Sequence, residues 1–301
     1  MLTPRKRLSV VIVTYGRDDC LVESLRCARR ALGPDDELIV VDQRPQHRPA
    51  TRAFLEELAR DPQIRILVLD VASMTLARNV GGLAAHGEVL LYLDDDVRFT
   101  PDLFERHLGH YRRPEVAGVA GHVREHGDLV FGPPWPYVRA ARGANMSFRR
   151  DAFLRAGGFD VNFGGSFWGE DTEFSERVRR RAGPIANGPD CVIDHRPAAQ
   201  AGAGNRRVGD PAAAREWYFH AYHNLFYWLL KPPAPRLGAL LTLIQWTRPP
   251  LRLALSAGFL RGAVLRAARA ALRTRRRGGT GPHWPSASLA IRALAPAGDV
   301  A

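Results

Sequence analysis

Cysteine is scarce in this sequence. The three that occur are Cys20, Cys27 and Cys191, and none belongs to a pair or to a CxxC spacing. That pattern argues against a disulfide framework and against a zinc site built from cysteine pairs. A reducing compartment fits the composition best.

Long apolar runs and phosphate-loop signatures are also missing. The N-terminal apolar run covers only Leu8–Val13 and no small-residue cleavage site follows it, so we expect no signal peptide. Residues 237–246 are apolar, but a membrane span needs about 20 residues. No GxxxxGK[ST] motif is present, which excludes a P-loop as the phosphate site.

Acidic residues almost disappear toward the C-terminus. From Trp217 to Ala301 there are twelve basic residues and one acidic residue, whereas residues 1–216 carry 31 basic and 30 acidic residues. Arginines alternate with apolar residues between Leu251 and Arg277, a basic amphipathic pattern suited to an anionic surface. We therefore expect residues 237–277 to bind an anionic membrane surface, and the protein to be cytoplasmic and peripheral at the inner face. A phosphorylated acceptor or a nucleic acid is an alternative anionic partner.

Apolar strand patterns are abundant in the first third of the chain. The sequence has 301 residues, 46% of them hydrophobic, which is ample for a core. Strands are predicted at residues 8–13, 37–41, 64–69 and 89–93. Helices are predicted between them at residues 20–31, 51–60 and 74–86, the last interrupted at Gly81-Gly82. This alternation is typical of βαβ units and predicts an α/β fold with a mostly parallel sheet.

Three carboxylates, Asp94, Asp95 and Asp96, directly follow the strand at residues 89–93. Adjacent carboxylates repel one another unless a cation lies among them. A divalent metal that holds a phosphate fits, because hard cations prefer carboxylate oxygens; a solvated acidic turn is the alternative. Asp42 also follows a predicted strand, and ligands of open α/β sheets bind beyond the carboxyl ends of strands. The pattern therefore favours a ligand-binding site at the carboxyl ends of these strands.

Six segments carry a resemblance to a known family. In chain order they are VVIVTYGR, VVDQ, ARNVGG, GEVLLYLDDDV, GANMSFRRDAFLRAGGFD and GED. Together they resemble a family-two glycosyltransferase of the GT-A fold over about residues 8–230. The resemblance implies a Rossmann-like central sheet flanked by helices, and an inverting enzyme that moves a sugar from a nucleoside-diphosphate donor to a hydroxyl acceptor. It also implies Mn²⁺ or Mg²⁺ as cofactor, and a glycan or lipid-linked acceptor in the synthesis of surface polysaccharide, glycolipid or a related glycan.

The sequence is expected to comprise three parts. Residues 1–210 are expected to form the nucleotide-sugar-binding and catalytic domain. Residues 211–277 are expected to form a helical, basic amphipathic extension, and residues 278–301 a loose tail.

Donor and metal roles follow from the same resemblance. Contacts with the nucleotide sugar are implied for Val13, Tyr15, Arg17, Asp42, Arg78, Asp94 and Asp95. A carboxylate at Asp42 can accept from a pyrimidine imide or a ribose hydroxyl, which allows UDP- and dTDP-sugars. Asp96 is implied as a direct metal ligand, and His195 as a further one. Ordinary turn, cap or surface roles remain the alternatives for Arg17, Asp42 and His195.

Proton transfer is implied for a different carboxylate. Asp171 in WGED matches the residue that takes the proton from the attacking hydroxyl. Glu170 is expected to contact the acceptor or groups around the donor, and Trp168 to stack on a sugar. Acidic residues also favour helix N-termini because of the helix dipole, which is the alternative reading. His223-Asn224 stands where many relatives carry Arg-Asn, so the role of this pair is left open.

Two other functions compete with the transferase. A nucleotidyltransferase with a related core usually has a glycine-rich, basic loop after the first strand, but TYGRDD offers one glycine and one arginine. A non-catalytic basic protein that binds membrane or nucleic acid would leave the aligned carboxylates without a purpose. We therefore expect an enzyme, and nucleic acid is disfavoured as a partner.

Overall fold

The computed structural model describes residues 6–125, 128–130, 135–164, 169–196, 211–231, 266–274 and 291–294. The strands are β1 Leu8–Thr14, β2 Asp36–Asp42, β3 Ile64–Leu69, β4 Val89–Asp94, β5 Val97–Arg98, β6 Gly118–Glu125, β7 Asp128–Val130, β8 Tyr137–Val138, β9 Asn145–Arg149, β10 Ile185–His195 and β11 Ile291–Ala293. The helices are α1 Asp18–Ala31, α2 Pro49–Leu58, α3 Met74–Ala84, α4 Leu103–His110, α5 Arg150–Ala156, α6 Glu170–Arg181 and α7 Pro211–Leu230. Residues 266–274 are also helical.

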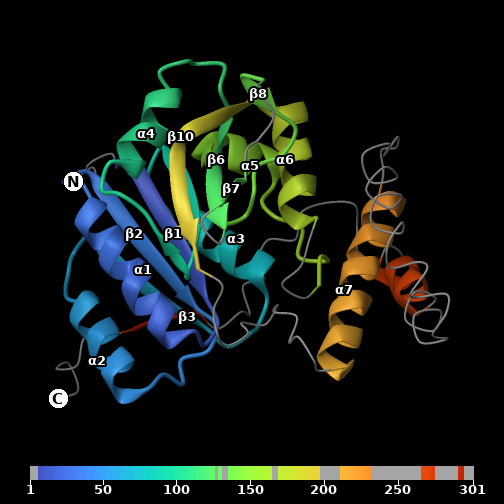
Figure 1. Ribbon diagram of the computed structural model, residues 1–301, viewed down its shortest axis with the longest axis horizontal. Helices are drawn as coiled ribbons and strands as arrows, with labels where there is room; N and C mark the ends of the chain where they lie inside the picture. Colours follow the sequence, from blue (N-terminus) through green and yellow to red (C-terminus); the bar gives the residue numbers. More distant parts are fainter. Residues whose placement is uncertain are drawn as a thin grey trace.

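The strands form one mixed sheet (Figure 1). Its order is β11-β3-β2-β1-β4-β9-β6-β10-β5, with β7 beside β6 and β8 beside β10. The predicted parallel pairing holds for β1 to β4. From β9 onward antiparallel pairs dominate, and β6–β10 is the parallel pair among them. The fold is therefore α/β, and its sheet has a parallel half and a mixed half.

The strand order reverses at β1, which lies between β2 and β4. Thr14 is in register with Asp42, and Val13 with Asp94. The carboxyl ends of these three strands therefore meet at one edge of the sheet. In open α/β sheets this switch point is where ligands bind, and the acidic triplet lies there.

Helices cover the sheet on opposite faces because successive strand residues point to opposite sides. Val10 and Ile12 of β1 belong to a core cluster with residues of α1, α2 and α4. Val11 and Val13 belong to a second cluster with residues of α3, α5 and α6. All seven residues of β1 are buried, as expected for a continuous apolar run between two helical layers.

Helix α3 packs closely on the sheet through its glycines. The predicted interruption at Gly81-Gly82 is wrong, because α3 runs through both residues. A Cβ atom on Gly81 would lie 2.4 Å from Val11 Cγ1, and one on Gly82 would lie 2.4 Å from the Tyr92 hydroxyl. The glycines are thus needed for the approach of the helix to β1 and β4, and this contact sets the position of Arg78 in the same helix.

We expect Gly82→Ala to destabilise the protein by about 1–3 kcal/mol, because the added methyl group overpacks the core. Gly109→Ala is the matched control: Gly109 is an exposed residue of α4 with no atom near its missing Cβ. There alanine is expected to stabilise the helix by up to about 1 kcal/mol. Urea unfolding of the two variants measures both effects, and equal signs would contradict the packing argument.

The C-terminal residues differ from the expected loose tail at one place. Ile291–Ala293 form β11, which pairs antiparallel with β3, and Arg292 forms an ion pair with Asp70 at 3.2 Å. Of the predicted membrane-binding residues 237–277, only residues 266–274 are among those described. Within the described residues no helix has the length and apolarity to cross a membrane.

Candidate active site

Asp95 is the most deeply buried member of the acidic triplet. The Thr14 hydroxyl donates to its Oδ2 at 2.6 Å, and the Arg17 guanidinium lies 2.5 Å from its Oδ1 and also pairs with Asp96. Burial raises the pKa of Asp95 to about 6, although the neighbouring Arg17 lowers it. Thr14 belonged to the quoted motif but was not predicted as a site residue. It joins the end of β1 to the end of β4.

Asp94, Asp96 and His195 form a group whose ligand atoms all lie within 4.8 Å of one another. The pairing of β10 with β5 sets His195 opposite Val97, and its Nε2 lies 3.2 Å from Asp96 Oδ1. This contact raises the pKa of His195 above its usual value. The geometry thus brings together Asp96 and His195, the two residues predicted as metal ligands, and adds Asp94, which was expected on the nucleotide side.

The residues of this group fit a divalent ion. Asp96 Oδ1 is buried and, among the described residues, its close polar contact is the ion pair with His195 Nε2 at 3.2 Å, so a lone pair of this carboxylate oxygen remains for a cation. Two carboxylates and an imidazole are a donor set that Mn²⁺ accepts, and ligands at about 2.1 Å from an octahedral ion stand about 3 Å apart. The separation of Asp96 and His195 agrees with such a pair.

Arg78 connects the triplet to the start of α6. Its side chain is buried, and its guanidinium lies 3.4 Å from Asp94 and 3.1 Å from Glu170. Burial lowers the pKa of Arg78, but Glu170, Asp94 and Asp171 together raise it above its usual value. Burial, with the neighbouring Asp171, raises the pKa of Glu170 to about 7. Glu170 thus supports Arg78 rather than facing solvent.

Asp171 lies in the first turn of α6 and is half-buried. Its Oδ2 accepts from the Gly143 amide at 3.0 Å, and its Oδ1 accepts from the Thr172 amide at 2.6 Å. Oδ1 also accepts from the Thr172 hydroxyl at 3.2 Å. A carboxylate oxygen can accept two bonds, so these contacts orient the group and leave Oδ2 room for a substrate proton. Gly143 precedes β9 and was not predicted as a site residue. Trp168 lies outside the described residues.

Asp42 does not contact the triplet and is held by a histidine that the sequence reasoning missed. Its Oδ1 accepts from the Arg44 amide at 2.9 Å, and its Oδ2 lies 2.9 Å from His47 Nε2. The other imidazole nitrogen lies 2.6 Å from Asp18. The bond to Asp42, followed by that to Asp18, raises the pKa of His47 to about 9. A protonated His47 therefore fixes the carboxylate at the end of β2.

The remaining predicted donor residues lie on β1 and the turn after it. Val13 is buried in the last part of β1, next in register to Asp94. Tyr15 is half-buried, and the Arg44 guanidinium lies 5.9 Å from its ring centroid. The turn is made by Gly16 at φ +70°, a conformation that favours glycine.

A second histidine-containing cluster does not fit a metal. His110, Asp190 and Cys191 converge within 4.8 Å, but His110 Nδ1 accepts from Arg113 and its Nε2 lies 2.8 Å from Asp190. Because arginine can only donate, the proton of a neutral His110 must be on Nε2, where a metal would need a lone pair. Burial raises the pKa of the Cys191 thiol, which opposes the thiolate form.

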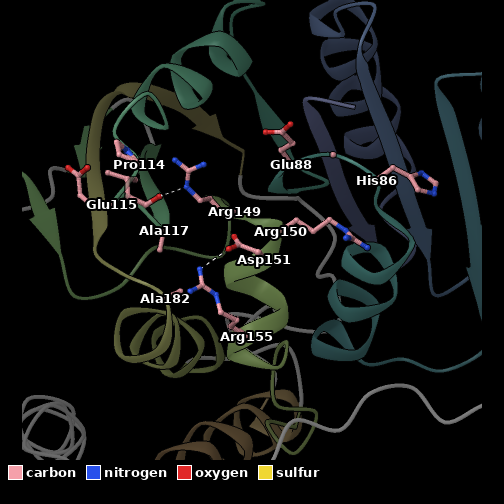
Figure 2. A pocket seen from close by; sticks show the side chains of 12 residues that line it. His86, Glu88, Pro114, Glu115, Ala117, Arg149, Arg150, Asp151, Arg155 and Ala182 are labelled. Atoms are coloured by element: carbon pink, nitrogen blue, oxygen red, sulfur yellow. Dashed lines mark hydrogen bonds and ion pairs between the residues drawn. The ribbon is translucent and has the colours of Figure 1, made fainter. Parts of the chain in front are cut away.

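A cavity of about 570 Å³ lies at the other end of β4, lined by residues just before that strand and by α5 (Figure 2). The number of arginine side chains that line it equals the number of acidic side chains. They are Arg149, Arg150 and Arg155, and Glu88, Glu115 and Asp151. Arg149 donates to three backbone carbonyls and Arg155 to Asp151. None of the predicted site residues lines this cavity.

Comparisons with known proteins show the family of the chain. Residues 9–171 match the family described as glycosyl transferase family 2. The succinoglycan biosynthesis protein ExoM of Rhizobium meliloti is 28% identical over 214 residues, which cover 63% of this chain and 66% of that protein. The chain thus spans just under two thirds of this curated relative.

Two solved structures share the fold. The mannosyltransferase PcManGT from Pyrobaculum calidifontis, in complex with GDP-Man and Mn²⁺, has a TM-score of 0.57 at 18% identity, over 92% of this chain and 77% of that one. S. aureus TarS 1–349, in complex with UDP-GlcNAc, has a TM-score of 0.59 at 14% identity, over 89% and 81%. The predicted GT-A fold is confirmed.

Proposed function

The chain belongs to glycosyl transferase family 2, and from this membership we propose that it transfers a sugar from a nucleoside-diphosphate donor to a hydroxyl acceptor, with inversion at the anomeric carbon. The observation that carries the proposal is the convergence on Arg78. Carboxylates from the end of β4 and from the start of α6, Asp94 and Glu170, contact the same buried guanidinium. The candidate ion ligands and the candidate base thus face one switch point.

The reaction assigned to this site is a single displacement. The acceptor oxygen attacks the anomeric carbon while the bond from that carbon to the diphosphate oxygen breaks, and Asp171 takes the hydroxyl proton. Asp94, Asp96 and His195 would hold Mn²⁺ or Mg²⁺, which supplies Lewis-acid stabilisation of the departing diphosphate. Arg78 lies between the proposed ion ligands and the proposed base, and it orients Asp94 and Glu170.

The nucleotide is proposed to lie over the ends of β1 and β2. Tyr15 offers a ring face to the base, and Asp42, fixed by His47, offers carboxylate lone pairs to an imide or a ribose hydroxyl. Val13 and Arg17 complete the walls of this subsite, and Asp95 fixes Arg17. UDP- and dTDP-sugars suit these contacts. TarS was solved with UDP-GlcNAc and PcManGT with GDP-Man, so a guanosine donor belongs in the test.

A donor screen tests the function. The full chain with Mn²⁺ is expected to bind one of the UDP-, dTDP- or GDP-sugars and to release its nucleoside diphosphate, and EDTA is expected to abolish the release. Adding candidate glycan and lipid-linked acceptors should raise the rate. Absence of binding to every nucleotide sugar in the screen would overturn the proposal.

The acceptor is proposed to be a glycan or lipid-linked glycan, reached from an anionic membrane surface at the cytoplasmic face. The arginine-rich composition of residues 237–277 supports this partner. In flotation assays the full chain should bind vesicles with anionic lipid more tightly than neutral vesicles, with the difference lost at high salt. Equal binding to both vesicle types would contradict membrane attachment through charge.

A further inference from the structure

Helix α7 presents a row of polar side chains to the catalytic domain. Asn224 and Tyr227 of α7 and Lys231, the residue directly after the helix, follow one another at intervals of three and four residues, so they lie along one side. His223 is also buried, and its Nε2 lies 3.1 Å from the Thr274 hydroxyl. Apolar residues of the same part of α7 pack with Phe163 and with the helix at residues 266–274 (Figure 1). A polar row inside an apolar contact is costly unless each group has a partner.

Asn224 holds the backbone of Gly164 in two directions. Its Oδ1 accepts from the Gly164 amide at 3.1 Å, and its Nδ2 donates to the Gly164 carbonyl at 3.0 Å. Asn79 of α3 holds Phe159 in the same way, at 2.7 and 2.8 Å. The segment from Phe159 to Gly164 is therefore fixed at each end by an asparagine, one from α3 next to Arg78 and one from α7.

Lys231 is buried among carboxylates. Its Nζ lies 2.6 Å from Asp160 and 2.6 Å from Glu173, and the Tyr227 hydroxyl donates to the same Asp160 oxygen at 2.9 Å. Arg177 forms two hydrogen bonds with Glu173, at 2.8 and 2.7 Å. Two cations thus balance two buried carboxylates. Removing one cation would leave an unpaired buried charge, which is costly.

Glu173 connects this network to the proposed base. It lies in the first turn of α6, two residues after Asp171, and its amide donates to the Gly169 carbonyl at 2.8 Å. Asp160 precedes the first residue of α6 by ten positions in the sequence. Lys231 therefore ties Asp160 to the end of α6 that carries Asp171, and Asn224 fixes Gly164, which lies between them in the sequence.

We propose that Lys231 and Asn224 are positioning residues for the transfer reaction: they hold the N-terminal turn of α6 so that Asp171 faces the acceptor hydroxyl. The inference rests on the proposed role of Asp171. It also assigns a role to Asn224 of the His223-Asn224 pair, and it makes α7 a functional part of the catalytic domain rather than a separate extension.

Lys231→Met tests the inference because it keeps the side-chain length and removes the charge. Without the ion pairs of Lys231, kcat is expected to fall by up to about 100-fold, the loss that a misplacement of about 1 Å can cause. The KM for the donor and the affinity for its nucleoside diphosphate should stay unchanged, since no donor-binding residue is in this network. Lys231→Arg should recover most of kcat. Lys6→Met is the matched control: Lys6 is the other lysine of the sequence and contacts carbonyls of Pro34 and Asp36.

Hydrogen exchange gives a readout that does not depend on activity. Amides at the start of α6 should exchange faster in Lys231→Met than in the wild type or in Lys6→Met. If Lys231→Met does not fold, Asn224→Ala replaces it, because it deletes the bonds to Gly164 without leaving a buried charge. Wild-type kcat in the folded variant, or equal losses of kcat and diphosphate affinity, would overturn the positioning role. Wild-type kcat in Asp171→Asn would instead refute the proposed base.

Discussion

Asp171→Asn is expected to lower kcat about 10²- to 10⁴-fold, the range that a positioned general base contributes. The asparagine carbonyl oxygen can still accept from the Gly143 amide, which in the wild type donates to Asp171 Oδ2 at 3.0 Å. The amide group therefore keeps the bond to Gly143, but its nitrogen replaces the Oδ1 that accepts from Thr172, so the variant loses that local bond together with the ability to take a proton. Nucleoside-diphosphate affinity should remain at the wild-type value, as measured by calorimetry.

The matched control for this substitution is Asp151→Asn. Asp151 also lies in the first turn of a helix, but it is exposed and pairs with Arg155 at 2.7 Å. It should retain wild-type kcat. A wild-type rate in Asp171→Asn would move the base role to another group, and Glu170 is the nearest carboxylate in sequence. Glu170→Gln would then be the variant that loses activity.

The strands that form the site were predictable because their cause is local. The runs at residues 8–13 and 89–93 are continuous and apolar, and each ends at polar residues that meet at the sheet edge. The placement of Asp95 and Asp96 beyond β4 follows from these runs. Asp171 at the first turn of α6 follows from a short motif and a helix start.

The contacts that hold the site were not predictable, because they join residues distant in sequence. The sequence around His47 does not indicate that its imidazole bridges Asp18 and Asp42. In the sequence, Lys231 is only a basic residue that follows a predicted helix. The ion pairs with Asp160 and Glu173 are formed in the fold. Gly81 and Gly82 suggest a break in a helix when only propensity is considered, but close packing on the sheet overrides that preference.

These long-range contacts explain how short motifs that are far apart in the sequence come together in one candidate site. Arg78 connects β4 with α6, Thr14 connects β1 with β4, and His195 brings the end of β10 to Asp96. Each connection pairs a buried polar group that would be costly alone. The polar network therefore fixes the register among elements that the apolar core only brings near one another.

Asp96→Asn is expected to weaken Mn²⁺ binding by at least about 100-fold, because substitution of outer partners of metal ligands alone costs about 10- to 100-fold. The loss should appear in titrations of Mn²⁺ without donor, followed by electron paramagnetic resonance, and donor turnover should fall with it. Asp190→Asn is the control, since Asp190 belongs to the cluster whose imidazole nitrogens are hydrogen-bonded; it should bind Mn²⁺ as the wild type does. His195→Gln should give an intermediate loss, because Asp94 and Asp96 remain. If Asp96→Asn kept wild-type affinity while Asp190→Asn lost it, the ion would have to lie at the α4–β10 contact, and the acidic triplet would hold only the nucleotide.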